Sequence, residues 1–443
     1  MNRRLLAALR RPVPGTSGLR LPGVFGRLVL RGRPYLLVLV VSTFVVSRWF
    51  HTGTFIATGD MGPFIRRGWA PELTWSWSHQ VTGAGSASYA VARGFEVILI
   101  WCCHAVGLGE YTAQWLFYTC IYGLVGVGVA YLAAAFVRSE VAVVAAGAFG
   151  VLNGFFLTRL PNPLNIISVG SVALLTGLAM RIAAGRRIPT PVAGLALLPT
   201  SFLGFNPPMI VVAYAWALAG TPLLALLVLG RRSALRLLWW FVRAAPLALL
   251  LNIWWLVPLA QGFLGGGGAT ANAAFTDPTS WSWSQVNNLP PNVLTMVANW
   301  AWYRPQYLPF AADLDQPAWI WIRYLLPAVV FAAPVFARRS QRRLALVCLG
   351  LVIVFVTLAK GLRPPLIELN LLLYQYVPGF WLFREPMSKL GQLLILLYGL
   401  LLAVYVDSTA ARLRALRTLR AAHPAPGGRL WPAAQAPGNH SVA

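Results

Sequence analysis

The stretch "VGLGEYTAQWLFYTCIYGLVGVGVAYLAAAF", Val106 to Phe136, decides the fold class. Within it, residues 113–136 form a continuous run without a single charged side chain. A helix of about 20 apolar residues is long enough to cross the hydrocarbon core of a bilayer. The stretch therefore predicts a membrane-spanning helix.

The same apolar character extends over the whole chain. Of its 443 residues, 58% are hydrophobic and only 11% are charged, whereas about 25% of residues are charged in a typical soluble domain. We therefore predict an all-α integral membrane protein. The formal net charge of +25 is attributed to cytoplasmic loops beside anionic membrane lipids, so we expect no nucleic-acid partner.

Apolar runs of suitable length occur about ten times, and an even number of spans places both chain ends on one side. The main arginine clusters also fall on that side, which the positive-inside rule makes cytoplasmic. We expect a multi-pass protein of the plasma membrane with both termini in the cytoplasm. The predicted spans are residues 35–51, 113–136, 140–158, 163–183, 190–204, 208–229, 237–262, 319–337, 343–360 and 388–407.

The run "FEVILIWCCHAVGLG", Phe95 to Gly109, is also apolar but does not fit this count. Treating it as a span would move Arg186 and Arg187 to the outside and invert every later loop. We therefore predict that it forms a helix lying along the outer membrane interface.

The topology divides the chain into three parts. Residues 1–34 form a basic cytoplasmic segment, 35–410 the membrane domain, and 411–443 a basic cytoplasmic tail that we expect to be disordered. The run after the N-terminal arginines lacks a small-residue cleavage site, so we expect it to be a retained first span. The three large outer segments are residues 52–112, 263–318 and 361–387.

The first outer segment contains "ATGDMGPFIRRG", Ala57 to Gly68, with the carboxylate of Asp60 just past the first span. The glycines and Pro63 favour a turn that would hold this carboxylate near the membrane surface. One interpretation is a catalytic base. The other is an Asx-turn or a helix N-cap.

The stretch "PGFWLFREPMSKLGQLLILLYG", Pro378 to Gly399, places Arg384 and Lys389 at the outer end of the last span. A guanidinium and an ammonium at the positive end of a helix dipole favour a phosphate-binding site. The alternative is snorkelling of both chains with an Arg384–Glu385 ion pair.

Aromatic side chains gather in the second outer segment, in "WSWSQVNNLPPNVLTMVANWAWYRPQY". Flat rings stack on the C–H faces of sugars, and amides bind hydroxyl groups, so the pattern indicates a sugar-binding surface. An aromatic belt at the membrane interface is the alternative, although it does not explain the amides. The candidate sugar-binding residues are Trp281, Trp283, Trp300, Trp302 and Asn288.

This layout resembles the GT-C class of membrane glycosyltransferases. Within that class the chain is most similar to the membrane part of the actinobacterial arabinofuranosyltransferases, through the stretches "FREPMSKLG", "GFFLTRLPNP" and "FNPPMIVV". The resemblance covers residues 35–410, and the long outer carbohydrate-binding modules of that family are not present in this sequence.

The resemblance implies a polyprenyl-phosphate sugar donor, arabinofuranose as the sugar, a cell-envelope polysaccharide acceptor and inversion at the sugar. It assigns the general base to Asp60. Should Asp60 be a turn or cap residue instead, Glu72 or Asp313 is the next candidate. No metal ligands are expected, although a divalent metal is compatible with this chemistry. A general base and cations at the leaving phosphate would each accelerate the transfer by about 10²-fold or more.

Two other functions use similar residues. A flippase or transporter of a lipid-linked glycan would need the same aromatic and cationic surface, and a non-catalytic scaffold of envelope assembly would need none of these groups. Convergence of Asp60, Arg384 and Lys389 around one outward cavity would favour the enzyme.

Overall fold

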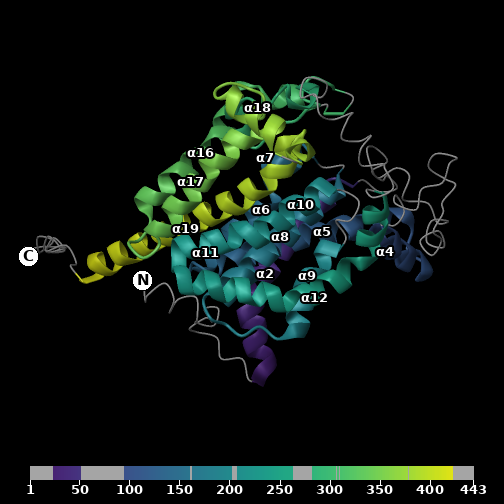
Figure 1. The fold of residues 1–443 in the computed structure, drawn as a ribbon. Coiled ribbons are helices and arrows are strands. Elements are labelled where there is room, and N and C mark those ends of the chain that lie inside the picture. The colour runs from purple at the N-terminus through teal and green to yellow at the C-terminus, as the bar shows by residue number, and fades with distance from the viewer. Residues whose placement is uncertain are drawn as a thin grey trace, which may run out of the picture.

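The computed structural model describes residues 23–50, 94–159, 162–201, 207–262, 282–305, 307, 308, 310–377 and 379–422. Every regular element in these ranges is a helix (Figure 1). The first half contains α2 (Gly23–Ser47), α4 (Gly94–Ala105), α5 (Glu110–Ala133), α6 (Glu140–Val151), α7 (Gly154–Leu157), α8 (Pro163–Ala183), α9 (Thr190–Ser201), α10 (Pro207–Ala215) and η4 (Trp216–Gly220). The second half contains α11 (Thr221–Leu229), α12 (Arg231–Gly262), η6 (Ser282–Gln285), α14 (Pro290–Leu294), α15 (Ala311–Leu314), α16 (Pro317–Phe336), α17 (Arg342–Ala359), α18 (Ile367–Tyr376), η7 (Phe380–Phe383) and α19 (Pro386–Ala422).

Eight helical segments in the described residues are long and apolar enough to cross a membrane. The predicted class, an all-α membrane protein, is therefore confirmed. Two further predicted spans coincide with shorter apolar helices, Gly32–Ser47 and Pro191–Ser201. The count of ten spans, and the side of the membrane on which each loop lies, stay predictions.

The core is built around α5, α8 and α19, with α2 and α6 packed against them. Glycines allow the close approach: a Cβ at Gly128 of α5 would lie 2.9 Å from the Gly170 carbonyl oxygen of α8. Small residues let membrane helices pack backbone against backbone in this way. Figure 1 shows α16 and α17 on one side of α19, with α8, α9 and α12 on the other.

Helix α4 has 12 residues and packs against the start of α5 through Ile100, Cys103 and Ala113. At about 1.5 Å per residue it is roughly 18 Å long, shorter than a bilayer core of about 30 Å. This length fits the predicted interfacial helix, whose position relative to the lipid stays a prediction.

Loops that the predicted topology places on one face are joined by hydrogen bonds. Near the middle of α19, the Ser139 N–H and the Gln341 side-chain amide both donate to Asp407, at 2.9 and 3.0 Å. Nearer the start of α19, the Asn299 amide donates to the Thr158 carbonyl at 2.6 Å. The two groups of loops therefore lie at different levels along α19.

Candidate functional site

The candidate site is formed around the first turn of α19. This helix begins at Pro386, and proline suits a first helical position because its missing N–H has no helical partner there. Lys389 follows in the first turn and is 7% exposed. Its ammonium lies 3.7 Å from a carboxylate oxygen of Glu385.

A second buried cation, Arg159, comes from the loop between α7 and α8 and is 5% exposed. Its guanidinium donates to Thr158 Oγ1 at 3.0 Å and to the Ala298 carbonyl at 2.6 Å. It also lies 4.4 Å from the centre of the Phe155 ring. These contacts fix the guanidinium, while its Nε–H has no acceptor among the described residues.

Arg159 is electrostatically coupled to both Glu385 and Lys389. Burial lowers the pKa of Arg159 to about 10, and the Glu385 carboxylate opposes that shift. The guanidinium therefore keeps its positive charge at neutral pH.

Polar side chains of α8 complete the surroundings of Lys389. The Ser388 hydroxyl accepts from the Lys389 ammonium at 3.1 Å and donates to Asn165 Oδ1 at 3.4 Å. One turn deeper, Ser168 donates to the side-chain oxygen of Gln392. We call Arg159, Asn165, Glu385, Ser388 and Lys389 the Lys389 cluster.

Arg384 lies directly before this cluster, with an exposed side chain. Its backbone is fixed because its carbonyl accepts from Ser284 Oγ at 2.7 Å and from Gln285 Nε2 at 3.0 Å. Gln285 also accepts from the Leu362 N–H at 2.7 Å, which ties the second and third outer segments together. With Arg384, the part of the site that the structure describes holds three cations and one carboxylate.

The aromatic residues of the second outer segment divide into two sets. Trp283 and Trp300 form an edge-to-face pair with ring centres 5.6 Å apart, and Arg304 lies over both rings at 5.8 and 5.4 Å. Trp300 also contacts Tyr307, at 5.3 Å between ring centres. Trp283 is 53% exposed, so this set, the Trp283 surface, offers ring area to a ligand.

The second set holds the segment together. The Trp302 indole N–H donates to Asp315 at 3.0 Å, and the ring is 5% exposed. Asn288 is buried and donates to the Ala359 carbonyl at 3.0 Å. Of the predicted sugar-binding residues that the structure describes, Trp283 and Trp300 are therefore the better candidates.

Asp60, Glu72 and Trp281 lie outside the described residues. The predicted convergence is seen only in part: Arg384 and Lys389 are neighbours that interact electrostatically. Asp313, the other candidate base, is exposed on α15. The catalytic assignment of Asp60 stays a prediction.

A cavity of about 600 Å³ lies across α7 from the Lys389 cluster. Phe155 of α7 faces α19, because a Cβ at Gly391 would lie 2.6 Å from its ring. The next residue, Phe156, lines the cavity together with Trp49 and Tyr122. The cavity therefore borders the end of α2, the helix that precedes Asp60 in the sequence.

Arg159 is the residue that our reading of the sequence missed. It lies in the short loop between the predicted spans 140–158 and 163–183, which the topology places outside. A cation there runs against the positive-inside preference, as Arg384 and Lys389 do. That shared departure could have identified all three.

No protein-family model, curated protein or solved structure matches this chain. The structure itself defines the class: an all-helical protein whose described residues include eight helical segments able to cross a membrane.

Proposed function

We propose that the chain is an inverting glycosyltransferase that uses a polyprenyl-phosphate sugar donor at the outer face of the plasma membrane. The observation that carries the proposal is the Lys389 cluster, in which, among the described residues, two buried cations and Arg384 accompany the Glu385 carboxylate. The sugar proposed is arabinofuranose and the acceptor is a cell-envelope polysaccharide.

Charge balance favours a phosphate at this site. Buried cations are unfavourable unless an opposite charge and hydrogen bonds compensate them. Glu385 supplies one negative charge to Lys389, and the start of α19 adds a partial positive charge. A donor phosphate would supply the missing negative charge and accept charge-assisted hydrogen bonds from the cations.

The proposed reaction uses the cations to assist the leaving group. The acceptor hydroxyl loses its proton to the Asp60 carboxylate, and its oxygen forms a bond to the anomeric carbon from the face opposite the phosphate. The bond between that carbon and the phosphate oxygen breaks, and polyprenyl phosphate leaves with the electron pair. Lys389, Arg384 and Arg159 stabilise the charge that develops on the phosphate.

The Trp283 surface suits the acceptor. Its rings offer apolar faces to a sugar, while Arg304 beside them can donate to hydroxyl groups. The two predicted subsites, cationic and aromatic, are linked through Ser284 and Gln285, which follow Trp283 and bind the Arg384 carbonyl.

The decisive experiment is a transfer assay with the purified full chain, a panel of radiolabelled polyprenyl-phosphate sugars and an envelope polysaccharide acceptor. We expect transfer of one pentose, and loss of that transfer in Lys389→Gln. A donor that crosses the bilayer without transfer would support a flippase instead. Absence of both donor binding and transfer would support a scaffold.

Lys360, the only other lysine of the chain, provides the matched control. It is also buried, but its ammonium donates to backbone carbonyls, at 2.7 Å to Arg363 and at 3.4 Å to both Gly361 and Leu366. Lys360→Gln removes the same charge from a purely structural setting. We expect a less stable protein whose folded fraction still binds donor.

A further inference from the structure

A second site is formed on the face of the molecule that we predict to be cytoplasmic. Two cavities meet there at Trp240, one apolar and one strongly basic. Neither contains a residue of the Lys389 cluster.

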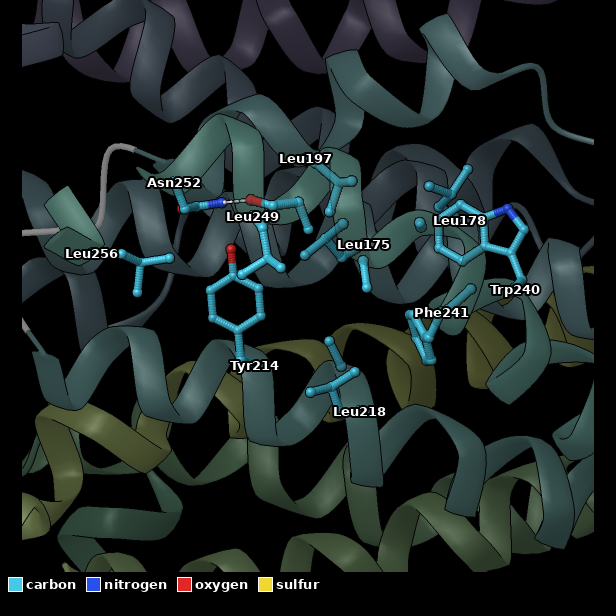
Figure 2. Close-up of a pocket in the computed structure, with 15 residues that line it drawn as sticks. Leu175, Leu178, Leu197, Tyr214, Leu218, Trp240, Phe241, Leu249, Asn252 and Leu256 are labelled. Atoms are coloured by element: carbon cyan, nitrogen blue, oxygen red, sulfur yellow. Dashed lines mark hydrogen bonds between the residues drawn. The ribbon is translucent and has the colours of Figure 1, made fainter. Parts of the chain in front are cut away.

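The first cavity, the apolar slot, has a volume of about 360 Å³ and lies between α8, α9, α10 and α12. Figure 2 shows Trp240 and Phe241 at one end of the slot and Asn252 and Leu256 at the other. Besides the Trp240 indole, its described polar lining residues are Tyr214 and Asn252. Tyr214 lies 3.2 Å from Thr200 Oγ1, and Asn252 donates to the Ala248 carbonyl at 2.7 Å. The slot therefore suits a hydrocarbon chain.

The second cavity, the basic cavity, has a volume of about 570 Å³. Four arginines line it, Arg186, Arg187, Arg236 and Arg243, and no carboxylate is among its described lining residues. Both volumes fall within the roughly 300–1,000 Å³ typical of ligand pockets.

The backbone and aromatic rings hold these arginines in place. Gly185, with a φ of +92°, ends α8 in a left-handed conformation that favours glycine and turns the chain into Arg186 and Arg187. Arg236 of α12 donates to the Ala183 carbonyl at 2.9 Å. Arg243 lies 5.1 Å from the Trp239 ring centre. The packing of α12 against the end of α8 therefore forms the basic cavity.

We propose that these two cavities together bind one anionic phospholipid of the cytoplasmic leaflet. The headgroup phosphate lies among the four arginines and one acyl chain extends past Trp240 into the apolar slot. A phosphate offsets the mutual repulsion of the arginines through charge-assisted hydrogen bonds. Basic pockets between helices on the cytoplasmic side recognise lipid headgroups in this way.

Trp240 lines both cavities, and this proximity favours a lipid over a soluble anion. A free phosphate would use the arginines but leave the slot empty, whereas a phospholipid uses both. The lipid would then lie between the end of α8 and α12. The apolar segment Arg231–Trp254 of α12 is only 11% buried.

The test measures binding of dioleoyl phosphatidylglycerol to the purified full chain by native mass spectrometry, with dioleoyl phosphatidylcholine as the neutral comparison. Arg186→Gln, Arg236→Gln and Arg243→Gln are combined in one variant. We expect affinity for the anionic lipid to fall by about tenfold or more, because charge-assisted hydrogen bonds are lost. The matched control combines Arg339→Gln, Arg342→Gln and Arg343→Gln, three exposed arginines on the same predicted face, and should bind normally.

A second variant, Ala244→Phe, fills the slot from α12 without changing any charge. It should weaken the dioleoyl lipid several-fold but leave dihexanoyl phosphatidylglycerol unaffected. Equal losses in the two arginine variants would overturn the proposal in favour of general surface charge. Competition by inorganic phosphate at the concentration of the lipid would overturn it in favour of a soluble anion. These readouts are independent of sugar transfer.

Discussion

Helix α19 carries one buried charge in its first turn, Lys389, and another near its middle, Asp407, and the protein surrounds the two charges differently. The Asp407 carboxylate accepts from the Ser139 N–H at 2.9 Å and from Gln341 at 3.0 Å, and it lies 3.6 Å from Arg338. About 27 Å away along the helix, at about 1.5 Å per residue, Lys389 lies near one carboxylate and two further cations.

The difference teaches how to distinguish a structural charge from a functional one. At Asp407 both carboxylate oxygens have protein partners, which come from the α5–α6 loop and the α16–α17 loop, so the charge joins those two loops. At Lys389 the residues that the structure describes supply more cations than carboxylates. A site of that kind is complete only when an anion binds, and its residues should affect binding more than folding.

The largest effect is expected where the Asp407 contacts are broken. Asp407→Ala removes the acceptor of the Ser139 N–H, one of the two acceptors of the Gln341 amide and the carboxylate beside Arg338. We expect the free energy of unfolding to fall by about 3–5 kcal/mol, measured as thermal and denaturant unfolding in detergent. Asp313→Ala, at an exposed position, is the control and should change stability by less than about 0.5 kcal/mol. Normal stability of Asp407→Ala would show that the Asp407 carboxylate has no structural role.

The second effect concerns donor binding at the start of α19. The double variant Arg384→Gln, Lys389→Gln should weaken donor binding by about 2–4 kcal/mol, because two charged partners of the phosphate are lost. Its unfolding midpoint should stay near that of the parent protein. Titration with a polyprenyl-phosphate sugar checks the first statement. Unchanged donor affinity would show that Arg384 and Lys389 do not bind the phosphate. Snorkelling at the membrane interface would then explain their position.

The third effect separates chemistry from binding. Asp60→Asn preserves the shape of the side chain but cannot take a proton, so transfer should fall by about 10²-fold or more. Donor affinity should not change, because the cations near Lys389 are intact. Single-turnover transfer and donor titration on the same preparation test this. Near-normal turnover of this variant would show that Asp60 is a turn or cap residue. Glu72 or Asp313 would then be the next candidate for the general base.

The smallest effect is expected at an exposed tryptophan, Trp283, and a buried tryptophan provides the contrast. Trp283→Ala should raise the acceptor KM in line with about 1 kcal/mol of lost ring contact, with little change in stability. Trp302→Ala should instead destabilise the protein, by about 3–5 kcal/mol for a buried aromatic ring. Acceptor titration and thermal unfolding of both variants measure this contrast. Equal acceptor effects in the two variants would show that exposure does not identify the sugar-binding ring.

The sequence by itself determined the class of the protein. Crossing a bilayer requires about 20 apolar residues in one helix, and this requirement is local, so runs such as residues 113–136 could be recognised one at a time. The same local reasoning placed Arg384 and Lys389 together, because they are close in the chain and at the start of one helix. The interfacial helix predicted for residues 95–109 came instead from the distribution of arginines over the whole chain, and the 12-residue length of α4 fits it.

Only the tertiary structure decided which distant residues share a site. Arg159 reaches the Lys389 cluster because glycines let α5 and α8 pack closely, and because Phe155 of α7 packs on Gly391 of α19. The structure likewise separated Trp302 and Asn288 from Trp283, although all three lie in one aromatic stretch. The physical reason is that exposure and charge pairing depend on what packs against a side chain. For Arg159 that neighbour, Ala298, is 139 residues away, and for Asn288 it is Ala359, 71 residues away.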